Sequence, residues 1–149
     1  MAEKLTSQEV SFLMQALKEV EMFTFLTVAE MDTLIGQMHK VIIPKGKVIF
    51  SEGDEGTAMF IIYKGRVQIA LKKWFGRKHE ITQLKPGEIF GEMSLATFRP
   101  RMASAHSVEK SECFVLFKSS FQFAIANNPA FIVHLKELID RRGLENRNI

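Results

Sequence analysis

Short apolar runs separated by glycine and proline fill the middle of the chain, from residue 39 to residue 117. Runs of this kind, bounded by turn residues, are typical of strands in antiparallel β-structures. They number about eight, the strand count of a double-sheet jelly roll, or β-roll. The glycines expected at the strand turns are Gly46, Gly53, Gly65 and Gly87.

One of these runs, residues 66–73, alternates in its sequence RVQIALKK. Successive side chains of a strand point to opposite faces, so Val67, Ile69 and Leu71 are expected to share one face. The sequence WFGRK around Gly76 predicts the tip of a hairpin.

Helices are predicted before the strands, within residues 5–38. The first is expected over residues 7–20 and the second begins at Thr27. Each starts with the pattern of a capping box, a threonine followed three residues later by a glutamate. In a capping box, the side chain of each residue accepts a hydrogen bond from the backbone N–H of the other. The two pairs are Thr6 with Glu9 and Thr27 with Glu30.

Helices are also predicted after the strands, within residues 118–143. Ser119 is a candidate cap of a short helix. Asn128 followed by Pro129 is a strong start signal for the last helix, because proline suits the first helical position. Gly143 is expected to end that helix.

The length and composition of the chain fit one globular domain over residues 1–149. Hydrophobic residues make up 46% of the sequence and charged residues 25%, an ordinary balance for a packed core. The single cysteine, Cys113, lies in the apolar run CFVLF and is expected to be buried. The predicted fold is therefore mainly β with flanking helices.

The stretch from Gly87 to Ala105 (GEIFGEMSLATFRPRMASA) is dense in residue types that recognise a phosphate and a sugar. Gly91 has no Cβ, which lets a ligand approach the backbone. Glu92 can accept hydrogen bonds from hydroxyl groups, and residues 93–96 predict a helical turn whose N–H groups suit an anion. Arg101 has a planar fork that matches two phosphate oxygens.

The order of residues in this stretch resembles the phosphate-binding cassette of cyclic nucleotide-binding domains, the cAMP and cGMP receptor modules of kinases, channels and bacterial transcription factors. The resemblance extends over about residues 23–142. It implies an eight-stranded β-roll with N-terminal helices and with C-terminal hinge and lid helices. The cassette residues that carry the resemblance are Phe90, Gly91, Glu92, Leu95, Pro100, Arg101 and Ala103.

The resemblance also implies roles for individual residues. Glu92 would hold the ribose 2′-hydroxyl and Arg101 the cyclic phosphate. Backbone N–H groups would come from Gly91, Met93 and Ser94, and Ser94 could add its hydroxyl or simply cap the helical turn.

Three apolar residues, Ile69, Leu84 and Phe90, are candidates for the wall beside the base, again by resemblance. From the pattern alone they are core residues. The small side chain of Ala103 leaves room in the cassette.

Met102 departs from the family pattern, in which the residue after the arginine is usually Ser, Thr or Ala. A threonine there goes with a preference for guanine, and methionine offers no hydroxyl. The sequence therefore favours cAMP over cGMP. The same departure motivates an alternative, a protein-interaction module that keeps the fold without binding a nucleotide.

Other chemistries have little support in the sequence. Four histidines lack metal-ligand spacing, and no P-loop or nucleophile motif occurs, so neither a metal, a further cofactor nor catalysis is expected. No run is long enough for a membrane span and no signal peptide is evident, which favours a cytoplasmic protein. An effector in trans, or a homodimer formed through the terminal helices, would receive the signal.

The basic loop KKWFGRKH, residues 72–79, is open to two interpretations. Basic residues among aromatic ones can bind nucleic acid. An exposed hairpin with solvated lysines is the simpler interpretation, because the net charge of +3 is mild. Nucleic acid is therefore an unlikely partner on sequence grounds.

Overall fold

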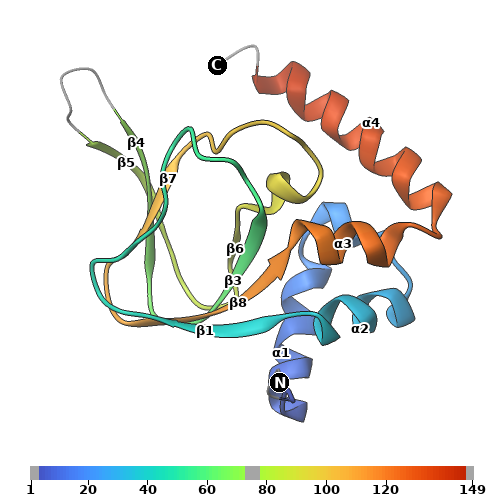
Figure 1. Cartoon of the computed structure of the whole chain (residues 1–149), viewed down its shortest axis with the longest axis horizontal. Helices are drawn as coiled ribbons and strands as arrows, with labels where there is room; N and C mark the ends of the chain where they lie inside the picture. The colour runs from blue at the N-terminus through green and yellow to red at the C-terminus, as the bar shows by residue number, and fades with distance from the viewer. Residues whose placement is uncertain (1–3, 73–77, 147–149) are drawn as a thin grey trace.

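The structure is a computed structural model, and it describes residues 4–72 and 78–146. Eight antiparallel strands form two four-stranded sheets, in the orders β1-β8-β3-β6 and β2-β7-β4-β5 (Figure 1). The predicted β-roll is confirmed. The strands are β1 (His39–Ile43), β2 (Val48–Phe50), β3 (Ala58–Lys64), β4 (Val67–Lys72), β5 (Lys78–Leu84), β6 (Ile89–Phe90), β7 (Ser104–Ser107) and β8 (Ser111–Phe117).

Glycines with positive φ stand at each of the predicted strand turns. At Gly65, φ is +100°, and a Cβ added there would lie 2.6 Å from the Cα of Ser111. Only glycine satisfies both the backbone conformation and the close approach. The predicted hairpin tip at Gly76 lies outside the described residues.

Burial along β4 does not follow a simple alternation. A β-bulge shifts the register between Ile69 and Ala70. Ala70 is buried, whereas Leu71 is 37% exposed. The extra residue is Ile81 of β5, and β4 pairs with β7 without a shift. That Leu71 shares a face with Val67 therefore stays a prediction.

The N-terminal helices are α1 (Ser7–Lys18), the 3₁₀ helix η1 (Glu21–Phe23) and α2 (Val28–Gly36). Both predicted capping boxes are present, and α1 ends two residues before its predicted end. The apolar faces of these helices join the core through buried residues such as Leu13, Leu17 and Leu34.

The C-terminal helices are α3 (Lys118–Ile125) and α4 (Pro129–Asn146). Asn128 caps α4, since its Oδ1 accepts a hydrogen bond from the backbone N–H of Phe131 at 2.9 Å. Two predictions were wrong. The residue that caps α3 is Phe117, without a side-chain bond, and α4 runs past Gly143. One glycine inside a helix costs about 1 kcal/mol, too little to end it.

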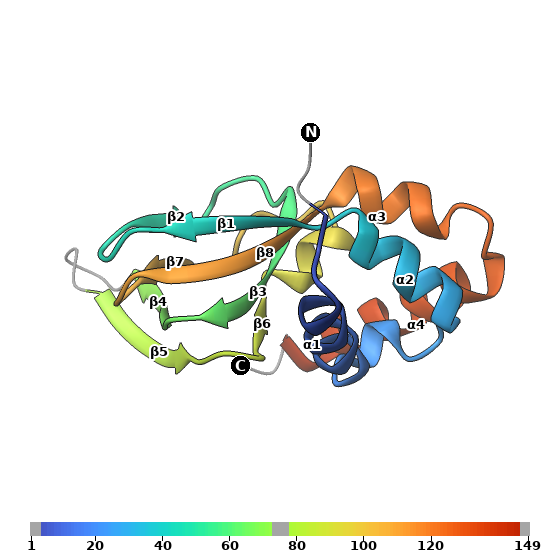
Figure 2. The ribbon, with the colours of Figure 1, turned by 90° about the horizontal axis from the view of Figure 1, so that it is seen from below.

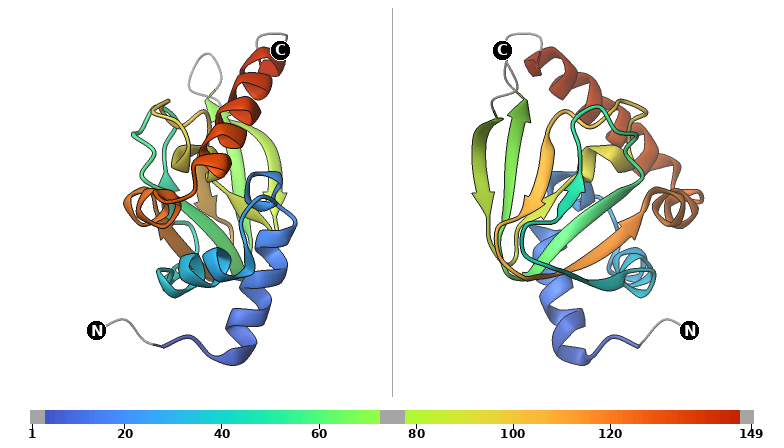
Figure 3. Two further views of the ribbon diagram at one scale, coloured as in Figure 1. Left: turned by 90° about the vertical axis from the view of Figure 1, so that its right-hand side faces the viewer. Right: turned by 60° about the vertical axis from the view of Figure 1, so that its left-hand side comes forward.

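The helices gather at one end of the β-roll (Figure 2). Figure 3 shows α2, α3 and the start of α4 side by side at that end. From there α4 extends past the 3₁₀ helix η3 (Glu92–Leu95), which follows β6 (Figure 1).

Hydrogen bonds tie α4 to the N-terminal helices. The Nδ2 group of Asn128 donates to both carboxylate oxygens of Glu30, at 3.0 and 2.8 Å. Near the other end of the helix, Nη2 of Arg141 lies 2.8 Å from Oε1 of Glu21.

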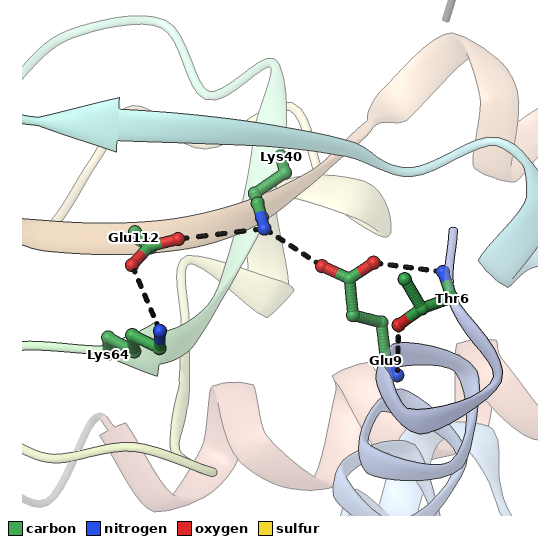
Figure 4. A network of polar contacts seen from close by, with 5 residues as sticks. All are labelled: Thr6, Glu9, Lys40, Lys64 and Glu112. Atoms are coloured by element: carbon green, nitrogen blue, oxygen red, sulfur yellow. Dashed lines mark hydrogen bonds and ion pairs between the residues drawn. The ribbon is translucent and has the colours of Figure 1, made fainter. Parts of the chain in front are cut away.

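A network of charges joins α1 to the sheet (Figure 4). The Nζ of Lys40 lies 2.9 Å from Glu9 and 3.6 Å from Glu112, which also lies 3.7 Å from Lys64. The backbone hydrogen bond from Thr6 and the contact with Lys40 lower the pKa of Glu9. The same contact with Glu9, aided by Glu112, raises the pKa of Lys40.

Candidate functional site

A cavity of about 330 Å³ lies among β4, β5, β6, η3, the loop that follows η3, and α4. All ten residues predicted for the site line this cavity, although they come from three separate parts of the sequence. Their binding of a ligand stays a prediction. The ten residues are Ile69, Leu84, Phe90, Gly91, Glu92, Met93, Ser94, Arg101, Met102 and Ala103.

Gly91 makes the turn from β6 into η3. Its φ of +76° is left-handed, which disfavours other residues. A Cβ added there would lie 2.5 Å from Nη1 of Arg101 and 3.2 Å from the carbonyl oxygen of Ala58. Glycine is therefore needed both for the turn and for the close approach of the arginine.

Arg101 is the most deeply buried charged side chain in the cavity wall, with 7% of its surface exposed. Its Nη1 donates to Oγ of Ser94 at 2.6 Å and to the carbonyl of Gly91 at 3.4 Å. Its Nη2 donates to the carbonyl of Ala58 at 2.7 Å. The guanidinium carbon also lies 4.0 Å from the ring centroid of Phe50.

These partners leave the positive charge of Arg101 uncompensated at close range. Among the described residues, no carboxylate lies within ion-pairing distance of the guanidinium, and its buried Nε has no hydrogen-bond partner. Burial lowers the pKa of Arg101, against the more distant charges of Asp54 and Glu92. Since a buried cation is costly without an anion, the site fits a small anionic ligand.

The remaining walls of the cavity are largely apolar. Ile69 and Leu84 come from the adjacent strands β4 and β5, and Ile139 comes from α4. Phe90 stacks on Phe60, with ring centroids 5.0 Å apart. An anion-binding corner beside apolar walls suits a ligand with a charged group and a flat apolar ring.

A comparison with known families identifies this arrangement. The profile described as "Cyclic nucleotide-binding domain" matches residues 40–128. The chain belongs to this family. The cassette stretch lies within the matched residues and forms one wall of the cavity.

Individual relatives agree with this assignment. The cyclic AMP receptor protein of Thermus thermophilus is 33% identical over 126 residues, which cover 85% of this chain and 58% of the relative. The cAMP-dependent protein kinase regulatory subunit of Dictyostelium discoideum is 30% identical, over 70% of this chain and 33% of that protein. Both relatives are longer, so the activities of the whole proteins are not assigned to this chain.

Solved structures share the fold. The structure described as cAMP-bound PfPKA-R matches with a TM-score of 0.78 and 28% identity, over 85% of this chain and 45% of that one. The cAMP-bound form of the EAL enzyme Bd1971 matches with a TM-score of 0.63 and 33% identity, over 74% of this chain and 29% of the other.

The cyclic nucleotide-binding domain has further lining residues that the sequence did not reveal as part of a site. Thr97 and Arg99 lie inside the cassette stretch and could have been found from that position. Ile89 lies in the same stretch, whereas Phe50 and Ile139 carry no such signal, because their patterns are those of ordinary core residues.

Met102 lies at the cavity with 64% of its surface exposed. Its side chain therefore projects largely into solvent, and the cavity beside it stays open. The departure from the family pattern at this position does not close the pocket.

Other chemical sites are scarce in the part of the chain that the structure describes. No group of three or more His, Cys, Asp or Glu residues there could hold a metal ion. Cys113 is fully buried, as predicted, and burial raises the pKa of its thiol to about 12. Of the described helices, none is both long and apolar enough to traverse a bilayer.

Proposed function

We propose that this chain is a receptor for cAMP that relays ligand binding to a partner and has no catalytic activity of its own. The observation that carries the proposal is Arg101, a buried cation in the cavity wall with neutral hydrogen-bond partners and one unpaired N–H group. An anionic phosphate would supply the negative charge that the neutral partners of Arg101 do not.

The ligand is proposed to bind with its phosphate between Arg101 and η3. A charge-assisted hydrogen bond of this kind contributes about 1.5–3 kcal/mol. Glu92, one of the lining residues, then accepts a hydrogen bond from the ribose hydroxyl. The purine packs against the apolar side chains of Ile69 and Leu84 and beneath Ile139 of α4.

Preference for cAMP over cGMP is proposed from Met102. Its side chain has no hydroxyl with which to recognise guanine. The Thermus relative is named for cyclic AMP, and both PfPKA-R and Bd1971 have structures with cAMP bound. Because Met102 leaves the cavity open, the alternative of an interaction module without a ligand has less support.

Relay of the signal is proposed to run through α4. Ile139 places this helix against the cavity, while Asn128 and Arg141 hold it to Glu30 and Glu21 of the N-terminal helices. A ligand shifts the position of α4 only if it binds one position more tightly than another. The receiver would be an effector protein, or a second copy, at the terminal helices.

The test is calorimetric titration of folded, nucleotide-free protein with cAMP and with cGMP. We expect micromolar or tighter binding of cAMP and weaker binding of cGMP. Arg101→Ala is expected to weaken cAMP binding on the order of 100-fold, or about 2.7 kcal/mol. Arg66→Ala, which removes an exposed arginine from the β3–β4 turn, is the control for loss of charge.

Arg101→Lys is a second variant, in case Arg101→Ala does not fold. It keeps the positive charge but loses the planar guanidinium that can bind two phosphate oxygens. We expect its affinity to fall between those of the wild type and Arg101→Ala. The receptor proposal fails if the folded, empty protein binds neither nucleotide, or if a folded Arg101→Ala binds cAMP as well as the wild type. Either result would favour the interaction module.

A further inference from the structure

A second groove, of about 530 Å³, opens beside β1, β2 and the end of β8. We propose that it is an interface between two copies of this chain. The two strands β1 and β2 lie along one side of the β-roll (Figure 2), and each is the outermost strand of its sheet.

Large apolar side chains stand exposed at the groove. Ile42 is 63% exposed, Val48 is 52% exposed and Phe117 is 45% exposed, and all three line the groove. An outermost strand also carries unpaired backbone N–H and C=O groups, which another strand can pair with. Apolar side chains gathered beside two such strands indicate a surface that is covered by another protein segment.

The charges at the groove favour a second copy as that protein. Lys47 lines the groove immediately before β2, whereas Asp54 and Glu55 line it beyond the other end of β2. In a two-fold symmetric pair whose axis crosses the groove at right angles, each end of the groove meets the opposite end of the partner's groove. Lys47 of each copy then faces the acidic residues of the other, with the apolar side chains between them.

The groove shares part of its wall with the nucleotide cavity. Phe50 and Arg101 line both, and the ring of Phe50 packs on the guanidinium. A copy bound in the groove therefore contacts the residues that hold the arginine in place. This link between dimer and nucleotide, unlike the dimer itself, rests on the proposed function.

Sedimentation equilibrium of the nucleotide-free protein tests the interface without reference to the ligand. We expect a monomer–dimer equilibrium that Val48→Asp weakens at least tenfold, because a charge would be buried at the interface. Phe123→Asp is the matched control, since Phe123 is 81% exposed but lies on α3. It is expected to leave the equilibrium unchanged.

Charge exchange gives a sharper test of the symmetry. Lys47→Glu and Glu55→Lys each place like charges opposite one another and are expected to weaken the dimer several-fold. The double variant restores the opposite signs and is expected to return close to wild-type association. The double variant would not regain wild-type association if Lys47 and Glu55 contacted other groups and not each other across the interface.

A wild-type protein that stays monomeric at high concentration overturns the proposal. The groove would then be a binding site for an extended segment of another protein. A dimer that survives Val48→Asp, dissociates with Phe123→Asp, or is not restored in the double variant also overturns it. Saturating cAMP is expected to change the dimer dissociation constant at least threefold. An unchanged constant in a protein that binds cAMP overturns the link to the nucleotide.

Discussion

Two clusters of charge in this molecule are built differently. In the network at α1, the ammonium of Lys40 lies 2.9 Å from Glu9 and 3.6 Å from Glu112, and its side chain is 34% exposed. At the cavity, Arg101 is 7% exposed, yet its near partners are a hydroxyl and two carbonyl groups. Of these two cations, the more deeply buried one has no carboxylate within ion-pairing distance among the residues that the structure describes.

This difference separates a structural contact from a binding position. A partly exposed ion pair already has its partner and remains solvated, so it changes stability modestly. Neutral acceptors fix the orientation of a buried guanidinium, but they supply no negative charge to balance it. The second arrangement gains most when an anion arrives, so it favours a ligand site.

After the loss of Arg101 itself, the largest effect is expected from Gly91→Ala, because the added Cβ displaces the arginine side chain. The left-handed backbone at Gly91 costs an added side chain about 1–2 kcal/mol, and the new Cβ would lie 2.5 Å from Nη1 of Arg101. We therefore expect lower stability and at least tenfold weaker cAMP binding. Thermal melting and calorimetry measure the two effects.

Gly46→Ala is the matched control for this prediction. Gly46 has a similar φ of +78°, but nothing lies within 4 Å of an added Cβ. It should lose similar stability and keep its nucleotide affinity. Equal affinities in the two variants would contradict a role for the position of Arg101.

Much of the fold could be predicted because its signals are local. A capping box or a turn glycine needs only neighbouring residues, and the pairs at Thr6 and Thr27 are present as predicted. The register shift between β4 and β5 and the continuation of α4 past Gly143 could not be predicted. The register shift depends on how β4 pairs with β5, which a local pattern does not contain. One glycine does not fix the end of a helix, because its cost of about 1 kcal/mol is small.

The same reasoning applies to the site. The cassette residues are close in sequence, so their order could be read as one motif. The partners that complete the environment of Arg101 come from elsewhere: Phe50 from β2 and the carbonyl of Ala58 from β3. A backbone carbonyl leaves no trace in the sequence, because every residue has one.

A smaller effect is expected from Lys40→Met, which breaks the other cluster. Glu9 and Glu112 lose their shared cation, so we expect a melting temperature lower by about 2–4 °C. The affinity for cAMP should not change, since Lys40 does not line the cavity beside Arg101. Lys45→Met, at an exposed position in the β1–β2 turn, is the control. A loss of affinity in Lys40→Met would contradict the separation of the two clusters.

The smallest effect is expected from Glu9→Gln, which removes the charge of Glu9 but keeps an acceptor for the capping box. Because the pKa of Glu9 is lowered in the folded protein, its charge stabilises the fold at pH values above the ordinary 4.5. That contribution is lost as the pH falls through the lowered pKa. The melting temperatures of wild type and Glu9→Gln should therefore differ at pH 7 and converge in acid. A difference that persists in acid would mean that the charge of Glu9 is not what stabilises this contact.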